Sequence, residues 1–363
     1  MKRILIVDDD SSIRILLETL LKKSGYEVHS AADGTAAISK AINFLPDAVL
    51  LDVEMPRTDG LSTLKEIRSY ASMKHLPVIM LTSHSDEETV LRAIRGGAND
   101  YILKPFDYGI LLAKLNGWLT ITLEEEWKAL PLLQSEALHR IKVKMAEAMD
   151  AGREGRELPY QDLKYASDAM AGSLEKSGFS DILLSTEAYH STLFLHSLLV
   201  SIFAYLFAIF RGTEKEEALL MALGGLLHDI GSVRIPNEIL FKPEELSPDE
   251  HEKVKMHVSH GLEMLGRTNN VDKTVLEICG CHHEHIDGTG YPRGLKGEQI
   301  PFHGRLIAIV EAYTSLTTKT VYRAAYDRRE ALKKLRDSEG HFDGDLLAEF
   351  ENAVLQGFRK KKA

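Results

Sequence analysis

The sequence predicts a multi-domain protein in which a doubly wound α/β domain with a five-stranded parallel sheet precedes an all-α domain. Three observations support this fold class. The chain has 363 residues, more than one ordinary hydrophobic core accommodates. Short apolar runs alternate with helical patterns in its first third, as in a parallel sheet. After Tyr160 no segment alternates convincingly between apolar and polar residues, so only helices are expected there.

Five short segments of the first third are expected to be strands. The runs 4–7, 48–51, 78–81 and 101–103 are apolar, and 27–30 is a further short strand. Helical patterns such as 12–24 and 35–43 lie between them. This order is typical of a flavodoxin-like α/β domain, whose parallel strands are covered by helices on both faces.

The composition indicates a globular, cytoplasmic protein. Hydrophobic residues make up 44% and charged residues 27% of the chain. The formal net charge of -10 argues against a nucleic-acid polymer as partner. Cys279 and Cys281 are too few for a disulfide framework and fit a reducing compartment. Their spacing beside His282 and His283 permits a zinc site, but we expect them to be ordinary helix residues.

Neither a signal peptide nor a membrane span is expected. The first predicted strand runs directly into acidic residues, unlike a secretory signal. The segment 193–210 is apolar enough to raise the question of a membrane span. It contains His196, Ser197 and Ser201 and lacks flanking basic anchors, so we interpret it as a buried core helix and expect no membrane as partner.

Polar residues stand at the ends of four of the predicted strands. They are Asp8, Asp9 and Asp10 after the first, Asp52 at the third, Thr82 at the fourth and Lys104 at the fifth. Open α/β sheets build their sites at these carboxyl ends. Three converging carboxylates repel one another unless a cation joins them, and a set of oxygen ligands suits Mg²⁺. A carboxylate beside Mg²⁺ can attack a phosphoryl donor, with Lys104 neutralising the developing charge and Thr82 bonding the transferred oxygens.

Residues 1–118 resemble the receiver domain of two-component response regulators. They carry ILIVDDD, LLDVEMPRTDG, VIMLTS and YILKPF in the order of that family. The resemblance implies a phospho-acceptor at Asp52, an Mg²⁺ site of Asp8, Asp9, Asp52 and the backbone carbonyl of Glu54, and a switch group of Thr82, Tyr101 and Lys104. It also implies a cognate sensor histidine kinase as the partner that supplies the phosphoryl group.

Residues 119–158 are predicted to form a helical connector. Pro131 is expected to start a helix, and Gly152, Gly155 and Pro159 are expected to break the pattern before Tyr160. Such a connector either carries a rotation or a dimerisation change between the domains, which is compatible with a homodimer, or acts as a passive spacer. The sequence leaves both interpretations open.

The predicted all-α domain, residues 159–363, has an uneven distribution of histidines. They are His196 on the apolar helix, His228 next to Asp229, His257 on a helical stretch, and the pair His282 and His283. Imidazole and carboxylate suit divalent transition metals such as Fe, Mn, Ni or Zn. Several histidines with a bridging carboxylate can hold two metals about 3.5–4 Å apart, as in two-metal phosphodiesterases. A lone buried histidine is more often a core residue, but this many on an apolar framework are better interpreted as ligands.

This order of histidines and aspartate is similar to that of the HD-GYP family in the HD phosphohydrolase superfamily. The stretches LLHDIGSVRIPNEIL, HHEHIDGTGYPRGLKGEQIP and GHFDGDLLAEF carry the likeness, and the second contains Gly290, Tyr291 and Pro292. The family hydrolyses the second messenger cyclic di-GMP to pGpG or GMP. The resemblance therefore implies a phosphodiesterase with cyclic di-GMP as substrate.

The functional residues of the family can be assigned to positions of this sequence. The resemblance implies metal ligation by His196, His228, Asp229, His257, His282, His283 and Glu311, catalysis by Asp229 and His228, and substrate contacts from Tyr291, Arg323 and Lys319. Asp229 would bridge the two metals. Glu311 stands where the family has an aspartate, so its carboxylate is retained but reaches one methylene further.

Other positions depart from the family pattern. Ser232 replaces a lysine that grips the scissile phosphate, and the direction of the nearby Arg234 is open. Thr320 replaces an arginine, leaving Arg323 and Lys319 as cations near that element. In addition, Thr314 replaces an aspartate, and Thr192 replaces a glutamate. Family members that bind a third metal carry this glutamate, so two metals are expected here.

These departures leave three functions open. The first is a phosphorylation-controlled cyclic di-GMP phosphodiesterase, supported by the full ligand set. The second is a weak or inactive module that binds a cyclic dinucleotide or a partner such as a diguanylate cyclase. The third is hydrolysis of another cyclic dinucleotide, such as cyclic GMP-AMP.

Overall fold

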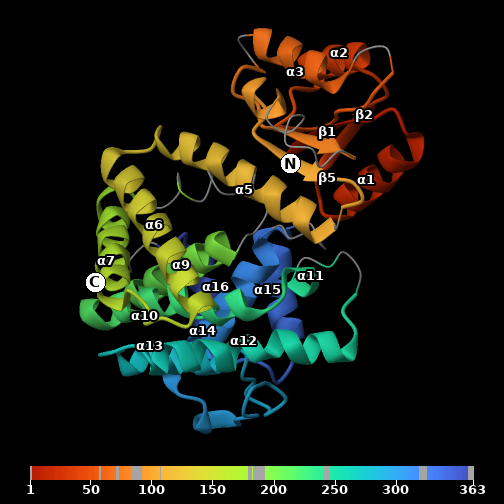
Figure 1. Cartoon of the computed structure of the whole chain (residues 1–363). Helices are drawn as coiled ribbons and strands as arrows, with labels where there is room; N and C mark the ends of the chain where they lie inside the picture. Colours follow the sequence, from red (N-terminus) through yellow and green to blue (C-terminus); the bar gives the residue numbers. More distant parts are fainter. Residues whose placement is uncertain are drawn as a thin grey trace.

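A computed structural model of the chain describes residues 2–56, 59–70, 73–83, 92–106, 108–178, 182, 193–240, 242, 245–318 and 325–358. An N-terminal α/β domain lies beside a larger helical domain, and one long helix, α5 (Tyr108–Trp127), runs from the first toward the second (Figure 1). The predicted fold class is therefore confirmed.

The N-terminal domain is built on five parallel strands. They are β1 (Arg3–Val7), β2 (Glu27–Ala31), β3 (Ala48–Asp52), β4 (Val78–Thr82) and β5 (Asp100–Leu103), in the order β2-β1-β3-β4-β5. Every predicted strand is present, with its ends shifted by no more than one residue. The strand order reverses between β1 and β3, and this is the point where such sheets form their sites.

Helices cover both faces of this sheet. α1 (Ser11–Lys23) and α5 pack on one face, and α2 (Gly34–Phe44) and α3 (Gly60–Ser69) on the other. Alternate residues of β1 accordingly enter different cores, Ile4 and Ile6 on the α1 side and Leu5 and Val7 on the α2 side. The carboxylates of Asp10, Asp33 and Asp59 accept backbone N–H bonds at the starts of α1, α2 and α3.

The connector contains α6 (Leu132–Glu154), which follows Pro131 as predicted. The predicted break at Gly152 is wrong, because α6 continues to Glu154 and ends at Gly155 with a φ of 70°. A Cβ at position 152 would lie 3.1 Å from the sulfur of Met264, so this glycine serves close packing. α5 runs through the boundary expected at residue 118 without a break, and that boundary stays a prediction.

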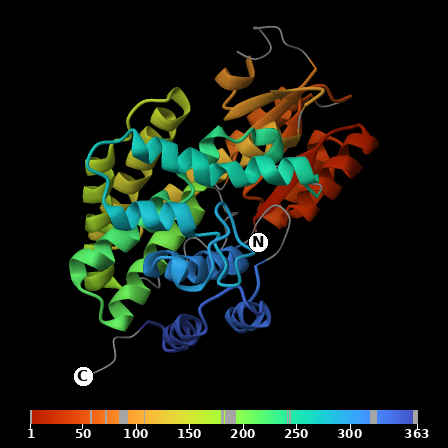
Figure 2. The same ribbon diagram turned by 90° about the horizontal axis from the view of Figure 1, so that it is seen from below.

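The C-terminal domain is helical, as predicted. Its helices are α7 (Tyr160–Ser177), α9 (Leu193–Arg211), α10 (Lys215–Leu227), α11 (Asn237–Leu240), α12 (Pro248–Gly266), α13 (Lys273–Cys281), α14 (Phe302–Thr317), α15 (Arg328–Asp337) and α16 (Gly344–Leu355), with 3-10 turns η2 (Ile230–Arg234) and η3 (Gly297–Gln299). The described residues after Tyr160 form no strand, only an isolated bridge between Asp287 and Lys296. The loop between α13 and α14 extends on the side away from the N-terminal domain and faces the viewer in Figure 2.

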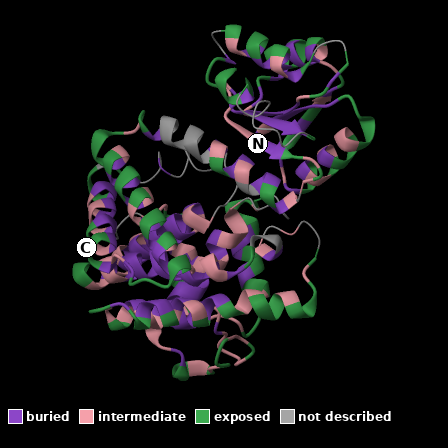
Figure 3. Cartoon of the chain, viewed as in Figure 1, coloured by how far each residue is buried: buried purple, intermediate pink, exposed green. Residues whose placement is uncertain are grey.

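The apolar helix α9 lies inside this domain (Figure 3). Its length and composition alone would allow it to cross a membrane, but 72% of its most apolar window is buried in the protein. The core of a soluble helical domain passes the same test, so its length and composition are weak evidence for a membrane span.

Candidate phosphorylation site and metal centre

The carboxylates predicted at the strand ends of the N-terminal domain lie together. The Nζ atom of Lys104 is 2.7 Å from Oδ2 of Asp8 and 3.1 Å from Oδ2 of Asp52. Both carboxylates are buried, and carboxylate oxygens of Asp8, Asp9 and Asp52 lie within 4.8 Å of one another. The guanidinium of Arg14 donates to the backbone carbonyls of Asp8 and Asp9 and so fixes this loop.

The charges of this cluster are unbalanced. Burial and the charge of Asp8 raise the pKa of Asp52, although Lys104 opposes the shift. Burial alone would lower the pKa of Lys104, but its bond to Asp8 and the charge of Asp52 outweigh burial and raise it. The cluster thus has one ammonium, which pairs with Asp8 and Asp52, for three carboxylates, and the excess of oxygen ligands suits a hard divalent cation.

The predicted switch residue Thr82 lies at the same edge of the sheet, whereas Tyr101 lies within β5. Thr82 is buried at the end of β4, and Tyr101 is half-buried on β5. Tyr101 pairs with Met80, two residues before Thr82, so both side chains lie on one face. The ammonium of Lys114 lies 5.5 Å from the centre of the Tyr101 ring. The backbone N–H of Glu54 is directed at Oδ1 of Asp52 over 3.4 Å.

In the helical domain Asp229 stands between two groups of histidines. Its Oδ2 lies 3.5 Å from Nε2 of His228. Its Oδ1 lies 3.1 Å from Nε2 of His257 and 3.6 Å from Nε2 of His282. Ligand atoms converge within 4.8 Å in two sets, one of His196, His228 and Asp229 and the other of Asp229, His257, His282 and His283. Asp229 is the member that the two sets share.

Three of these histidines have the same second interaction. The Nδ1 atoms of His228, His257 and His282 lie 2.8, 2.7 and 2.9 Å from the carbonyls of Gly225, Val254 and Cys279, each three residues earlier. A neutral ring that donates from Nδ1 presents a lone pair at Nε2, the usual arrangement of a metal-binding histidine. The buried Nε2 of His228 has no hydrogen-bond partner among the described residues. The donor set therefore fits transition-metal ions.

Burial keeps the rings of the first set uncharged. It lowers the pKa of His196 and of His228 to about 4, so both are neutral at pH 7. Burial opposes ionisation of Asp229, but the nearby His228 and His257 outweigh it and lower its pKa. The neutral rings of His196 and His228 beside the ionised Asp229 are in the protonation state that metal binding requires. Burial would lower the pKa of His257, but Asp229 outweighs burial and raises the pKa of this ring.

Glu311 on α14 approaches the first set without joining it. Its Oε1 lies 3.8 Å from Nε2 of His196 and accepts a hydrogen bond of 2.9 Å from Ser315. Burial and the charge of Asp229 raise the pKa of Glu311 to about 7. Glu311 thus lies at the edge of the cluster, and its role as a ligand stays a prediction.

A glycine explains how η2 and α12 come close enough to form this centre. A Cβ at Gly231 would lie 2.0 Å from the carbonyl oxygen of His257 and 2.4 Å from the nitrogen of Gly261. Only glycine permits this approach, because both atoms belong to the backbone. The approach brings Asp229, which precedes η2, against His257.

The loop after α13 folds back onto the histidines. The N–H of Tyr291 donates to the carbonyl of His283 over 3.0 Å, and the two rings stack with centres 4.6 Å apart. A Cβ at Gly290 would lie 2.5 Å from the same carbonyl oxygen. Glu284, which the sequence did not single out, is buried and accepts the N–H groups of Arg293 and Leu295. A charged residue directly after two predicted ligands was the available signal.

Comparisons with known proteins match both domains to known families. Residues 4–116 match the response regulator receiver domain and residues 195–346 match the HD domain. The chain is a response regulator with an HD domain. HD domains are metal-dependent hydrolases, and receiver domains bind Mg²⁺ and take their phosphoryl group from a donor such as a histidine kinase.

Two curated relatives match along nearly the whole chain. The cyclic di-GMP phosphodiesterase response regulator RpfG of Xanthomonas campestris pv. campestris is 29% identical over 361 residues, which cover 98% of this chain and 87% of the relative. The cyclic di-GMP phosphodiesterase of Thermotoga maritima is 27% identical over 364 residues, covering 99% and 93%. A 3'3'-cGAMP-specific phosphodiesterase of Vibrio cholerae is 33% identical over 154 residues, covering 42% and 30%.

Arg234 of the HD domain is turned away from the metal centre. Its Nη1 lies 3.0 Å from Oε2 of Glu263, and its Nε donates to the carbonyl of Gly152 over 3.3 Å. Gly152 belongs to α6 and Glu263 belongs to α12. Arg234 therefore does not take the place of a cation at the buried Ser232.

Both cysteines of the HD domain lie outside the two ligand sets. The Sγ of Cys279 is 3.5 Å from the carbonyl of His228, and burial raises the pKa of this thiol. The Sγ of Cys281 accepts a bond of 3.0 Å from Arg293.

Of the other positions that depart from the family pattern, Thr314 lies among the described residues. The hydroxyl of the buried Thr314 donates to the carbonyl of Val310, so it is turned toward its own helix. The predicted substrate contacts Lys319 and Arg323, together with Thr320 and Thr192, lie outside the described residues.

Proposed function

We propose that this response regulator is a phosphorylation-controlled, metal-dependent phosphodiesterase that hydrolyses cyclic di-GMP to pGpG or GMP. The observation that carries the proposal is the position of Asp229, which offers one carboxylate oxygen to each of two histidine sets. The two full-length relatives named as cyclic di-GMP phosphodiesterases support the same substrate.

Two divalent transition metals, Fe, Mn, Ni or Zn, would be held by the two histidine sets, with Asp229 as their bridge and Glu311 as an added ligand. When bound, such metals supply Lewis acidity and an activated water for attack on phosphorus. In the receiver domain Asp8, Asp9, Asp52 and the carbonyl of Glu54 would hold Mg²⁺.

The chain's own residues orient this chemistry. The Nδ1 bonds of His228, His257 and His282 hold each Nε2 toward Asp229 and keep the rings from rotating. The Tyr291 ring, stacked on His283, would contact the nucleotide, and the ammonium of Lys255 lies 5.6 Å from its centre. Arg323 and Lys319 would contribute further positive charge to the anionic substrate.

The receiver domain would control this activity. A sensor histidine kinase in the cytoplasm would transfer its phosphoryl group to Asp52, and Lys104 would bond the phosphoryl oxygens. Thr82 and Tyr101, which share one face of the sheet, would pass the change to the elements around β5.

A specific observation favours a second function, a weak or inactive module that binds a cyclic dinucleotide or a diguanylate cyclase. Ser232 offers no positive charge, and Arg234 is paired with Glu263 instead of replacing it. Loss of one donor to the transition-state charge typically costs about 100- to 1000-fold in rate. Hydrolysis of cyclic GMP-AMP is a third candidate, suggested by the partial match to a 3'3'-cGAMP-specific enzyme.

One experiment separates these functions. The full chain, loaded with Fe²⁺ or Mn²⁺, is incubated with cyclic di-GMP or cyclic GMP-AMP, with and without acetyl phosphate, and products are resolved by chromatography. Conversion of cyclic di-GMP that disappears in Asp229→Asn supports the proposal. Nucleotide binding with no product under any condition refutes it in favour of the binding module.

A further inference from the structure

An exposed stripe on α6 combines apolar and charged residues at regular spacing. Leu133 and Val143 are 48% and 40% exposed, and Glu136 and Arg140 between them are also exposed. Their spacings of three, four and three residues are those of the core positions of a coiled coil. Leu132 beside the stripe is 72% exposed and adds to the apolar surface at this end of α6.

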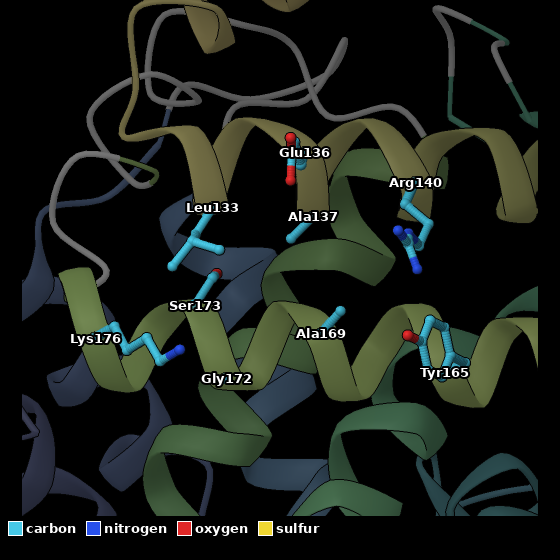
Figure 4. Close-up of a pocket in the computed structure, with 9 residues that line it drawn as sticks. All are labelled: Leu133, Glu136, Ala137, Arg140, Tyr165, Ala169, Gly172, Ser173 and Lys176. Atoms are coloured by element: carbon cyan, nitrogen blue, oxygen red, sulfur yellow. The ribbon is translucent and has the colours of Figure 1, made fainter.

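A groove of about 310 Å³ lies between this stripe and α7. Figure 4 shows the side chains of Leu133, Ala137 and Arg140 on α6 facing the row from Tyr165 to Lys176 on α7. The floor consists of small residues, among them Ala169 and Gly172, and a Cβ at Gly172 would have no neighbour within 4 Å. The guanidinium of Arg140 lies 5.2 Å from the centre of the 66% exposed Tyr165 ring at one end. The groove is thus open to the side chains of another helix.

The stripe is complementary to itself when reversed. Leu133 and Val143 lie equally far on either side of Leu138, and so do Glu136 and Arg140. An antiparallel copy of α6 would therefore set each leucine against a valine and each glutamate against an arginine. Among the described residues Glu136 forms no ion pair, and Arg140 contacts the Tyr165 ring rather than a carboxylate. A foreign partner does not require this symmetry, whereas a two-fold dimer does.

We propose that the chain forms a two-fold homodimer in which α6 packs antiparallel on α6 of a second copy. The two-fold axis would cross the exposed side of α6 midway between Glu136 and Arg140, at the height of the buried Leu138. Leu133 would contact Val143 of the partner subunit, and Glu136 would pair with Arg140 of the partner subunit. Side chains of the second copy would enter the groove over Ala169 and Gly172. The interface lies between the receiver helix α5 and the HD-domain helix α7, on the outer edge of the molecule in Figures 1 and 3.

Charge reversal tests the proposed pairing directly. Glu136→Arg and Arg140→Glu each place like charges together in a homodimer, and we expect each to weaken dimerisation at least about tenfold. An equal mixture of the two variants restores every opposite-charge pair, so heterodimers should form. Analytical ultracentrifugation of the full chain measures this, with one variant fluorescently labelled. Lys253→Glu, an exposed reversal on α12, is the matched control and should dimerise normally.

Gly172→Leu gives an independent test. The added side chain has room within the subunit, so the variant should fold with unchanged circular dichroism while its filled groove excludes the second copy. A wild-type chain that stays monomeric both with and without acetyl phosphate overturns the proposal. So does a charge-reversed variant that dimerises alone as tightly as the wild type.

Discussion

The Nε2 atoms of His257 and His282 lie 3.0 Å apart, although the Nδ1 atom of each ring already faces a backbone carbonyl. Two neutral rings that donate from Nδ1 would direct two lone pairs at each other. That arrangement is repulsive unless a cation or a proton lies between the two nitrogens. Since Asp229 is 3.1 and 3.6 Å from the same atoms, the stable occupant of this position is a positive charge.

Removal of metal should therefore destabilise the HD domain. Ions present at a hundred times their dissociation constant add about 2.7 kcal/mol, so chelation should lower Tm by roughly 5–10 °C. Differential scanning fluorimetry before and after chelation, and after Mn²⁺ is restored, measures the shift. His257→Ala should reduce the shift, whereas His251→Ala, an exposed change on the same helix, should not. An identical Tm in all metal states would contradict the prediction.

Glu311 should bind metal as an ionised carboxylate, so metal binding should release its proton. Burial and the charge of Asp229 raise the pKa of this carboxyl to about 7 in the metal-free protein. Below pH 7 a metal must displace the proton, so affinity should increase as the pH rises through 7. Calorimetry in two buffers of different ionisation enthalpy counts the released protons. Glu311→Gln should lose the pH-dependent release, and an unchanged proton count in this variant would argue against Glu311 as a ligand.

The strands and the grouping of the histidines around Asp229 could be predicted because their signals are local. β1, β3 and β4 are buried on both faces and therefore appear as unbroken apolar runs. The adjacent residues His228 and Asp229 indicate possible metal ligands without any tertiary information. The direction of Arg234 could not be predicted, since its partners Glu263 and Gly152 come from two other helices.

Two glycines also show what the local sequence cannot predict. Gly152 was expected to break a helix, because glycine weakens helices in general. It instead lies inside α6, where Met264 of a distant helix leaves little space for a Cβ. Gly231 gave no sequence signal of its own, yet its close approach to the backbone of His257 brings Asp229 against that histidine in the candidate metal centre. Contacts between distant backbones cannot be deduced from the spacing of residues along one segment.

Gly290→Ala should displace the loop that carries Tyr291. The new Cβ would lie 2.3 Å from the nitrogen of His285 and 2.5 Å from the carbonyl oxygen of His283, and neither backbone atom can move freely. A shift of about 1 Å in the stacked Tyr291 ring is expected to reduce kcat/KM on the order of a hundredfold. Gly344→Ala, where a Cβ meets nothing within 4 Å, should retain activity. Equal kcat/KM in the two variants would show that the loop geometry does not matter.

Ser232→Lys should increase phosphodiesterase activity. The substitution brings an ammonium to η2, next to the position of Asp229, where Arg234 does not supply one. A gain in kcat of roughly 10- to 100-fold is expected from added stabilisation of the phosphorane charge. Ser232→Met, similar in length but uncharged, separates charge from packing. If both variants show the wild-type rate, the missing charge does not limit the reaction.

Asp52→Asn should abolish phosphorylation and yet stabilise the receiver domain. Burial and the nearby Asp8 raise the pKa of Asp52 above its unfolded value, so its ionisation at neutral pH opposes folding. Stability from this group is present below the unfolded pKa and is lost as the pH rises through the folded pKa. The neutral amide removes that cost, and the urea midpoint at pH 7 should increase without Mg²⁺. Labelling by acetyl phosphate should vanish in Asp52→Asn but persist in Asp10→Asn, whose exposed carboxylate caps α1. Acid-labile phosphate that persists in Asp52→Asn would place the acceptor elsewhere.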